Sequence, residues 1–105
     1  MLNKTSKLQK VIIVTIGVLT KSQPFMKRLQ LTKVFKENLE RNDKNISVIL
    51  TSSLNSLHKQ RLIIRRRGDI QLTESGKQLA REVIDEIKKD YGKVDWVVLK
   101  EFLSK

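Results

Sequence analysis

Residues 62–73, with the sequence LIIRRRGDIQLT, restrict the fold of this chain more than any other stretch. Two short β-prone runs lie on either side of Gly68-Asp69, and a Gly-Asp pair is typical of tight turns. The stretch therefore predicts a two-stranded β-hairpin with Gly68 and Asp69 at its tip. Because the segments before and after it carry apolar residues at helical spacing, we predict an α+β fold that is mostly helical.

Two helices, separated by a turn of about four residues, are predicted directly before the hairpin. The earlier helix opens at Thr32 or an adjacent residue and ends at Asn42-Asp43. Asp43 or Asn45 caps the later helix, whose apolar residues recur at steps of four, four and three and form a one-sided core stripe. The apolar residues are Leu31, Val34, Phe35 and Leu39 in the earlier helix and Ile46, Leu50, Leu54 and Leu57 in the later one.

Two further helices are predicted after the hairpin. Thr73 caps the first, which ends near Tyr91-Gly92 because glycine is common just past a helix end. Asp95 caps a short last helix with a large apolar load for a terminal segment, and this load must be buried against another surface. It consists of Trp96, Val97, Leu99, Phe102 and Leu103.

An apolar run at residues 11–19 follows Lys4, Lys7 and Lys10, an order that also occurs in signal peptides. The run is far shorter than the roughly 20 residues of a membrane span, and only Thr20 and Ser22 offer the small residues of a cleavage site. We therefore expect a buried helix and no membrane association. Its apolar residues fall on two faces, and in a chain this small we expect another subunit to cover the second face. One face carries Leu8, Ile12, Thr15, Ile16 and Leu19, and the other carries Val11, Val14 and Val18.

The chain lacks several of the side chains on which most enzyme chemistry depends. The chain has no cysteine and a single histidine, His58, which excludes a disulfide, a thiolate cluster, a thiol nucleophile and a zinc site built from several histidines. The sequence also has no glycine-rich phosphate loop and no set of nucleophile, base and acid. We expect no metal, no cofactor and no enzymatic activity, and we expect His58 to pack or form a hydrogen bond near a helix end.

The net charge is +11, from 22 Lys and Arg against 11 Asp and Glu. All of it falls on residues 1–73, because seven basic residues at positions 74–105 are balanced by seven acidic ones. Such an excess is typical of proteins with a polyanionic partner, nucleic acid first and an anionic membrane second. The neutral last third is what we expect of a part that packs or dimerises.

A sequence signature spans the hairpin and its two flanking helices. It reads Leu54-x-x-Leu57-x-x-x-Arg61-Leu62-Ile63, then the basic hairpin, then Leu72-Thr73-x-x-Gly76-x-x-Leu79-Ala80. This signature resembles the recognition helix, wing and following helix of winged helix-turn-helix proteins, in particular MarR-like and PadR-like regulators and small archaeal members. Gly76 would let the following helix approach the sheet closely. Family members often have Gly in place of Arg61, and their hairpin is usually longer, which argues against deep insertion of this hairpin into the minor groove.

The resemblance implies a winged helix-turn-helix with a two-stranded wing and additional C-terminal helices, as one domain over residues 1–105. In this fold the helix-turn-helix would cover about 31–60, the wing about 62–73 and the dimerisation helices about 74–104. The second helix of the pair enters the major groove, and the hairpin touches the flanking backbone.

The resemblance also implies where DNA would bind. Hydroxyl and amide groups on the helix face away from the leucine stripe can bond phosphates or bases, and we expect Asn55 to read a base because Asn pairs two-point with adenine. In the hairpin, Arg65 and Arg67 share one strand face and Arg66 takes the other. The alternatives are a merely solvated helix face and a charged strand edge that prevents aggregation. The expected DNA-binding residues are Ser47, Thr51, Ser52, Asn55 and Lys59, with Ser53 and Ser56 beside them, then Arg65, Arg66 and Arg67, and finally Lys27 and Arg28 just before the earlier helix.

The leading functional hypothesis is a homodimeric, cytoplasmic protein that binds double-stranded DNA on the nucleoid and regulates transcription by occupancy, with no small-molecule ligand evident. The expected dimer interface consists of Val11, Val14, Val18, Trp96, Val97, Phe102 and Leu103. One alternative is a winged-helix protein-interaction module in a replication or other assembly, which the apolar last helix favours. Another is RNA binding. None of the five aromatic residues lies within the basic hairpin, however, so the hairpin has no aromatic side chain on which a base could stack.

Overall fold

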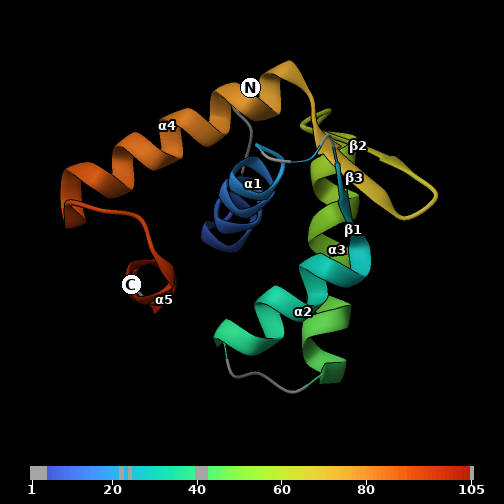
Figure 1. The fold of residues 1–105 in the computed structure, drawn as a ribbon, viewed down its shortest axis with the longest axis horizontal. Helices are drawn as coiled ribbons and strands as arrows, with labels where there is room; N and C mark the ends of the chain where they lie inside the picture. Colours follow the sequence, from blue (N-terminus) through green and yellow to red (C-terminus); the bar gives the residue numbers. More distant parts are fainter. Residues whose placement is uncertain (1–4, 22, 24, 40–42, 105) are drawn as a thin grey trace.

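The computed structural model describes residues 5–21, 23, 25–39 and 43–104. Within these ranges the chain forms five helices and three strands, and the prediction of a mostly helical α+β fold is confirmed (Figure 1). The order is α1 (Lys7–Leu19), β1 (Met26–Lys27), α2 (Arg28–Leu39), α3 (Asp43–Lys59), β2 (Ile63–Arg66), β3 (Asp69–Leu72), α4 (Glu74–Tyr91) and α5 (Trp96–Ser104).

Helix α1 lies in the middle of the fold and packs against α3, α4, α5 and β3 (Figure 1). All six residues at positions 11–16 are buried, on both faces of the helix. For Val11 and Val14, the cover that we expected from another subunit therefore comes from the chain itself. In the described ranges, no helix combines the length and the apolar character needed to cross a membrane.

The predicted hairpin is confirmed, but its tip lies one residue earlier than predicted. Arg66 pairs with Asp69, so Arg67 and Gly68 form the turn and Asp69 belongs to β3. Arg67 and Gly68 have φ angles of 50° and 85°, and two successive positive φ angles are those of a type I′ turn, whose twist matches that of the flanking strands.

The sheet has a third strand that the sequence pattern did not predict. Strand β1 pairs antiparallel with β3, with Met26 opposite Ile70, and gives the strand order β1-β3-β2. In the described residues, the predicted two-stranded hairpin is therefore part of a sheet of three strands. A strand of two residues is too short to show an alternating pattern.

Helix α2 begins at Arg28, four residues before the predicted start at Thr32. The Arg28 backbone N–H donates to the Gly68 carbonyl at 2.8 Å, which ties the start of α2 to the hairpin tip. Lys27 consequently lies in β1 and Arg28 inside the helix, whereas we expected both before it. The predicted end at Asn42 falls outside the described residues. Asp43 is the first residue of α3 and Asn45 also lies inside this helix, so the expectation that one of them precedes it as a cap is wrong.

The predicted boundaries of α4 and the predicted start of α5 are confirmed by their caps. The Thr73 hydroxyl accepts from Gly76 N–H at 3.1 Å, and α4 ends at Gly92 with a φ of 81°. The Asp95 carboxylate accepts from Val98 N–H at 2.9 Å at the start of α5. The predicted stripe of α3 is entirely buried, through Ile46, Leu50, Leu54 and Leu57.

Gly76 is the point of closest approach between α4 and the sheet. A Cβ at this position would lie 2.1 Å from the carbonyl oxygen of Leu62, which also accepts from Thr73 N–H at 3.1 Å. Real Cβ atoms do not come this close to an oxygen. The predicted need for glycine is confirmed.

Arg61, at the end of α3, adopts the left-handed conformation with a φ of 61°. Leu62 N–H donates to the Leu57 carbonyl and Arg61 N–H to the His58 carbonyl, both at 3.0 Å. This pair of bonds is the Schellman motif that ends α3, and Arg61 occupies the position in it that glycine fills most easily.

Candidate nucleic-acid interface

One face of α3 points into solvent and is almost entirely uncharged. Ser47, Thr51, Ser52 and Asn55 are exposed, as the spacing predicts, and Lys59 is exposed at the end of the helix. Ser53 is buried, contrary to the expectation that it lies beside these residues, because it faces the core with Leu54 and Leu57.

Arg28 connects the start of α2 to this face. Its Nη2 atom donates to the Thr51 hydroxyl at 2.9 Å and to the Ser47 carbonyl at 3.1 Å, and its Nη1 atom donates to the Thr32 hydroxyl. The Thr51 hydroxyl donates its own proton to the Ser47 carbonyl at 2.9 Å. Thr51 therefore holds Arg28 in place, and its hydroxyl proton is not free to reach a base.

Beside Arg28, α3 and the hairpin enclose a hollow of about 270 Å³. The described residues that line it are Arg28, Leu54, Arg65, Arg67, Gly68 and Ile70, and none of these is acidic. We call it the Arg28 hollow. Burial first, and the nearby charge of Arg65 second, lower the pKa of Arg28 from its ordinary value. Two guanidinium groups that repel each other in a partly buried place form a site that an anion would stabilise.

His58 links the hairpin to the end of α3. Its Nδ1 atom lies 3.4 Å from Arg65 Nη2, and the imidazole is exposed. The expectation of a hydrogen bond near a helix end is confirmed. Arg65 is thereby placed between α3 and the Arg28 hollow.

The three arginines of the hairpin divide between its two sides, as the strand alternation predicts. Arg65 and Arg67 line the Arg28 hollow, while Arg66 lines a second hollow with Phe25, Asp69 and other residues. On that second side Lys27 Nζ bonds Asp69 Oδ1 at 3.0 Å, so its charge is already balanced by a carboxylate. The cations that line the Arg28 hollow beside α3 are therefore Arg28, Arg65 and Arg67.

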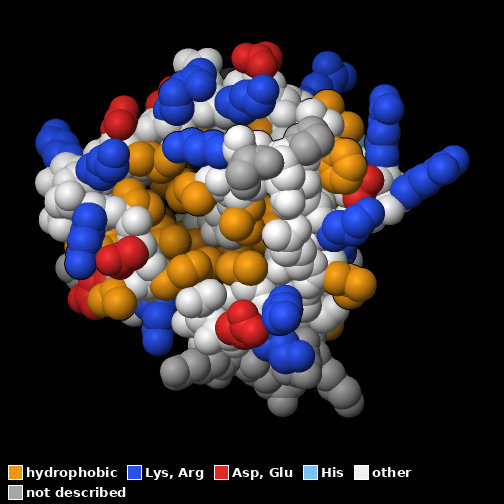
Figure 2. All heavy atoms as spheres, viewed as in Figure 1, with side chains coloured by type: hydrophobic (Ala, Val, Ile, Leu, Met, Phe, Trp, Pro, Cys, Tyr) orange, Lys and Arg blue, Asp and Glu red, His pale blue; other side chains and the backbone are white. Residues whose placement is uncertain are grey.

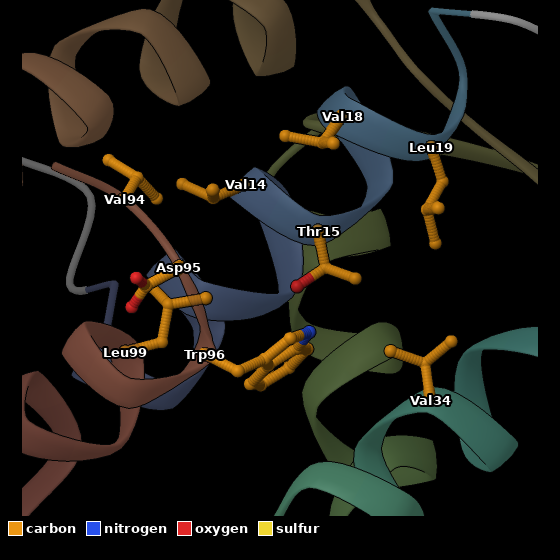
Figure 3. Close-up of a pocket in the computed structure, with 9 residues that line it drawn as sticks. All are labelled: Val14, Thr15, Val18, Leu19, Val34, Val94, Asp95, Trp96 and Leu99. Atoms are coloured by element: carbon orange, nitrogen blue, oxygen red, sulfur yellow. The ribbon is translucent and has the colours of Figure 1, made fainter.

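A second surface feature is an apolar hollow of about 170 Å³ between α1, α2 and α5. Figure 2 shows hydrophobic side chains gathered in a hollow on one face, with Lys and Arg side chains around it. Figure 3 shows Val14 and Val18 of α1, Val34 of α2 and Leu99 of α5 around the same space. Trp96 also lines it and packs edge to face on Phe35, with ring centroids 5.3 Å apart. The sequence pattern did not predict this hollow, because its walls come from three separate helices.

The residues expected at a dimer interface do not form one surface. Val11, Val14 and Phe102 are buried in the core, and Trp96 and Leu103 are partly buried against it. Val18 and Val97 are exposed, with 48% and 75% of the residue surface accessible. Of the seven expected interface residues, Val18 and Val97 are the ones that offer an exposed apolar side chain to a second copy.

In the described ranges, His, Asp and Glu side chains form no group of three that could hold a metal ion. No protein-family model matches the chain, and no curated protein matches it either. The function must therefore be argued from the surface of α3, the Arg28 hollow and the apolar hollow.

Proposed function

We propose that the chain is a winged helix-turn-helix protein that binds double-stranded DNA, with α3 in the major groove and the hairpin against the backbone. In this proposal α2 and α3 are the helix pair, and β2 and β3 form the wing. The observation that carries it is the Arg28 hollow, whose described lining holds three arginines and no acidic residue and lies beside the exposed polar face of α3.

A phosphate group matches the chemistry of the Arg28 hollow. Guanidinium groups bind phosphate oxygens through paired, charge-assisted hydrogen bonds, and Arg28 and Arg65 approach the hollow from two different elements. Contacts to phosphates fix the register of a protein on the duplex, while side chains in the groove read the sequence. A phosphate held here would place the outward face of α3 next to base edges.

The proposed assembly is a homodimer. Val97 on α5 and Val18 beside the apolar hollow supply exposed apolar surface of the kind that a second copy covers. Two-fold symmetry would place two α3 helices about 34 Å apart, to match half-sites one helical turn apart. The action on transcription would then follow from occupancy of such a site.

Fluorescence anisotropy of a labelled random-sequence duplex, measured at several salt concentrations, tests DNA binding. The test variant is Arg28→Gln/Arg65→Gln, and the control is Lys88→Gln/Lys89→Gln at the far end of α4, which removes the same charge from exposed side chains. We expect wild-type affinity to fall with salt at a slope of about −0.9 per phosphate contact, and the test variant to bind more weakly with a shallower slope. Equal losses in both variants would show a mere effect of net charge, and no binding at low salt would refute the proposal.

The apolar hollow favours one second candidate, a winged helix that serves as a protein-interaction module. Its walls expose aliphatic side chains together with Trp96, and aromatic residues are enriched at protein interfaces. Light scattering separates the two functions. A dimer that binds duplex DNA supports the first, whereas a strict monomer at micromolar concentration that does not bind DNA supports the second.

A further inference from the structure

The outward face of α3 carries one large apolar side chain, that of Val48, which is 68% exposed. A β-branched residue is a poorer helix former than Ala, and a side chain in water gains nothing from burial. Val48 therefore does not contribute to the stability of the helix on which it lies. It also falls outside the hydroxyl and amide residues that the sequence pattern singled out.

Val48 lies at the centre of the face that points away from the core. With 100° per residue, it is about 165° around the helix axis from the mean direction of the buried stripe. Asn55 follows seven residues later, nearly two full turns, and so lies on the same line about 10.5 Å further along. Val48 belongs to the N-terminal half of α3, the half that a helix-turn-helix protein brings to base edges.

The neighbours of Val48 leave few groups that can read a base. The Thr51 hydroxyl is engaged with Arg28 and with the Ser47 carbonyl. Along the middle of the face this leaves the methyl groups of Val48, the hydroxyl of Ser52 and the amide of Asn55, with the ammonium group of Lys59 at the C-terminal end of the same line. In the major groove of unmodified DNA, the apolar group that a base pair presents is the C5-methyl of thymine, and the preferred partner of an Asn amide is adenine.

We propose that Val48 determines specificity by packing on the C5-methyl group of thymine, so that α3 selects A·T pairs through Val48 and Asn55. This inference rests on the proposed binding of duplex DNA and adds which feature of the groove α3 reads. Val48 and Asn55 act from the same line of the helix. They would therefore contact base pairs at two separate positions of one half-site.

The test compares two labelled 24-base-pair duplexes, one of alternating dA and dT and one in which every dT is replaced by deoxyuridine. The two differ only in the C5-methyl groups. We expect the wild-type chain to bind the thymine duplex about fourfold more tightly for each α3 engaged, the factor that burial of one methyl-sized group contributes. Val48→Ser should bind both duplexes equally, at the wild-type affinity for the deoxyuridine duplex.

Leu29→Ser is the control, because it removes an apolar side chain from a position on α2 that is 81% exposed and that neither the proposed dimer nor the reading of bases uses. It should keep the preference for thymine. If the wild-type chain binds both duplexes with equal affinity, or if Val48→Ser keeps the preference, the inference is overturned while DNA binding still stands. If the wild-type chain binds neither duplex at low salt, the proposed function itself fails, and the inference fails with it.

Discussion

The Arg28 guanidinium donates to the Thr51 hydroxyl across the junction of α2 and α3, at 2.9 Å. The same nitrogen donates to the Ser47 carbonyl, so one side chain of α2 contacts two residues that lie one turn apart on α3. In the proposed complex, this contact decides where the Arg28 charge stands relative to the groove.

Replacing Thr51 by Val keeps the shape of the side chain and removes one of the three acceptors of Arg28. Because the bond is exposed, we expect the free energy of unfolding to fall by no more than about 1 kcal/mol. Without this contact Arg28 should bind phosphate less well, and the Kd of the Thr51→Val variant for duplex DNA should rise about fivefold. Thr20→Val, which removes a hydroxyl from the C-cap residue of α1, is the control and should leave the Kd unchanged. An unchanged Kd in Thr51→Val would show that Arg28 needs no positioning by Thr51.

Two glycine substitutions should have opposite effects on stability. At Gly76 a Cβ meets the Leu62 carbonyl at 2.1 Å, and we expect Gly76→Ala to lower the free energy of unfolding by about 2 kcal/mol or more. At Gly17 in α1, the nearest atom to a Cβ is Leu72 Cδ1 at 3.4 Å, which is ordinary contact. Gly17→Ala should therefore raise stability by about 0.5 kcal/mol through helix propensity. Urea unfolding measures both, and an equal effect at the two sites would contradict the close approach at Gly76.

Arg61→Gly should stabilise the chain. The left-handed φ of 61° costs an arginine about 1 kcal/mol that glycine does not incur, although glycine gives back part of this through the greater freedom of the unfolded chain. We expect a net gain of about 0.5 kcal/mol in urea unfolding, and a loss for Arg61→Val because β-branched residues tolerate this conformation worst. If Gly and Val behave alike, the Schellman geometry does not govern this position.

Stability should depend on pH through Asp95. The Val98 backbone N–H is the main cause that holds the pKa of Asp95 below its ordinary value of 3.8, and the neighbouring Lys93 adds to it. Since the folded pKa is the lower one, the ionised carboxylate stabilises the fold above the unfolded pKa, and this contribution is lost as pH falls through the folded pKa. Asp95→Asn should therefore be less stable than wild type at pH 7, with the difference shrinking below about pH 4. Unfolding curves at several pH values test this, and a difference that does not change with pH would contradict it.

A charge at position 97 should dissociate the proposed dimer without unfolding it. Val97 is 75% exposed, so Val97→Asp disturbs no packing within the chain. We expect light scattering to give the monomer mass for this variant and the dimer mass for wild type and for Val48→Asp. A dimer that survives in Val97→Asp would move the interface away from α5.

The elements with strong periodicity or clear caps could be predicted from the sequence. The α3 stripe, the Thr73 and Asp95 caps and the end of α4 at Gly92 follow from patterns within a few residues. The start of α2 could not, because Leu29 is 81% exposed and the apolar stripe begins only at Leu31. The turn was misplaced by one residue since Gly68 fits either central position of a type I′ turn.

The candidate site was predictable as a set of residues but not as an arrangement. The spacing along α3 is enough to place Thr51 and Asn55 on the solvent face. The bond between Arg28 and Thr51 joins residues 23 positions apart on two helices, and no local pattern encodes such a contact. The apolar hollow is missed for the same reason, since three helices contribute to it.

The backbone N–H of Arg28 donates to the Gly68 carbonyl at the hairpin tip, and the side chain of the same residue donates to the Ser47 carbonyl of α3. Helix α3, the hairpin and the arginines between them therefore form a preorganised binding site, whose width is fixed when the chain folds. A partner that enters it costs little conformational entropy on the protein side. Such a site would also bind duplexes differently according to the width of their grooves. Because groove width depends on the stiffness of the DNA sequence, base pairs that the protein does not contact would also affect binding.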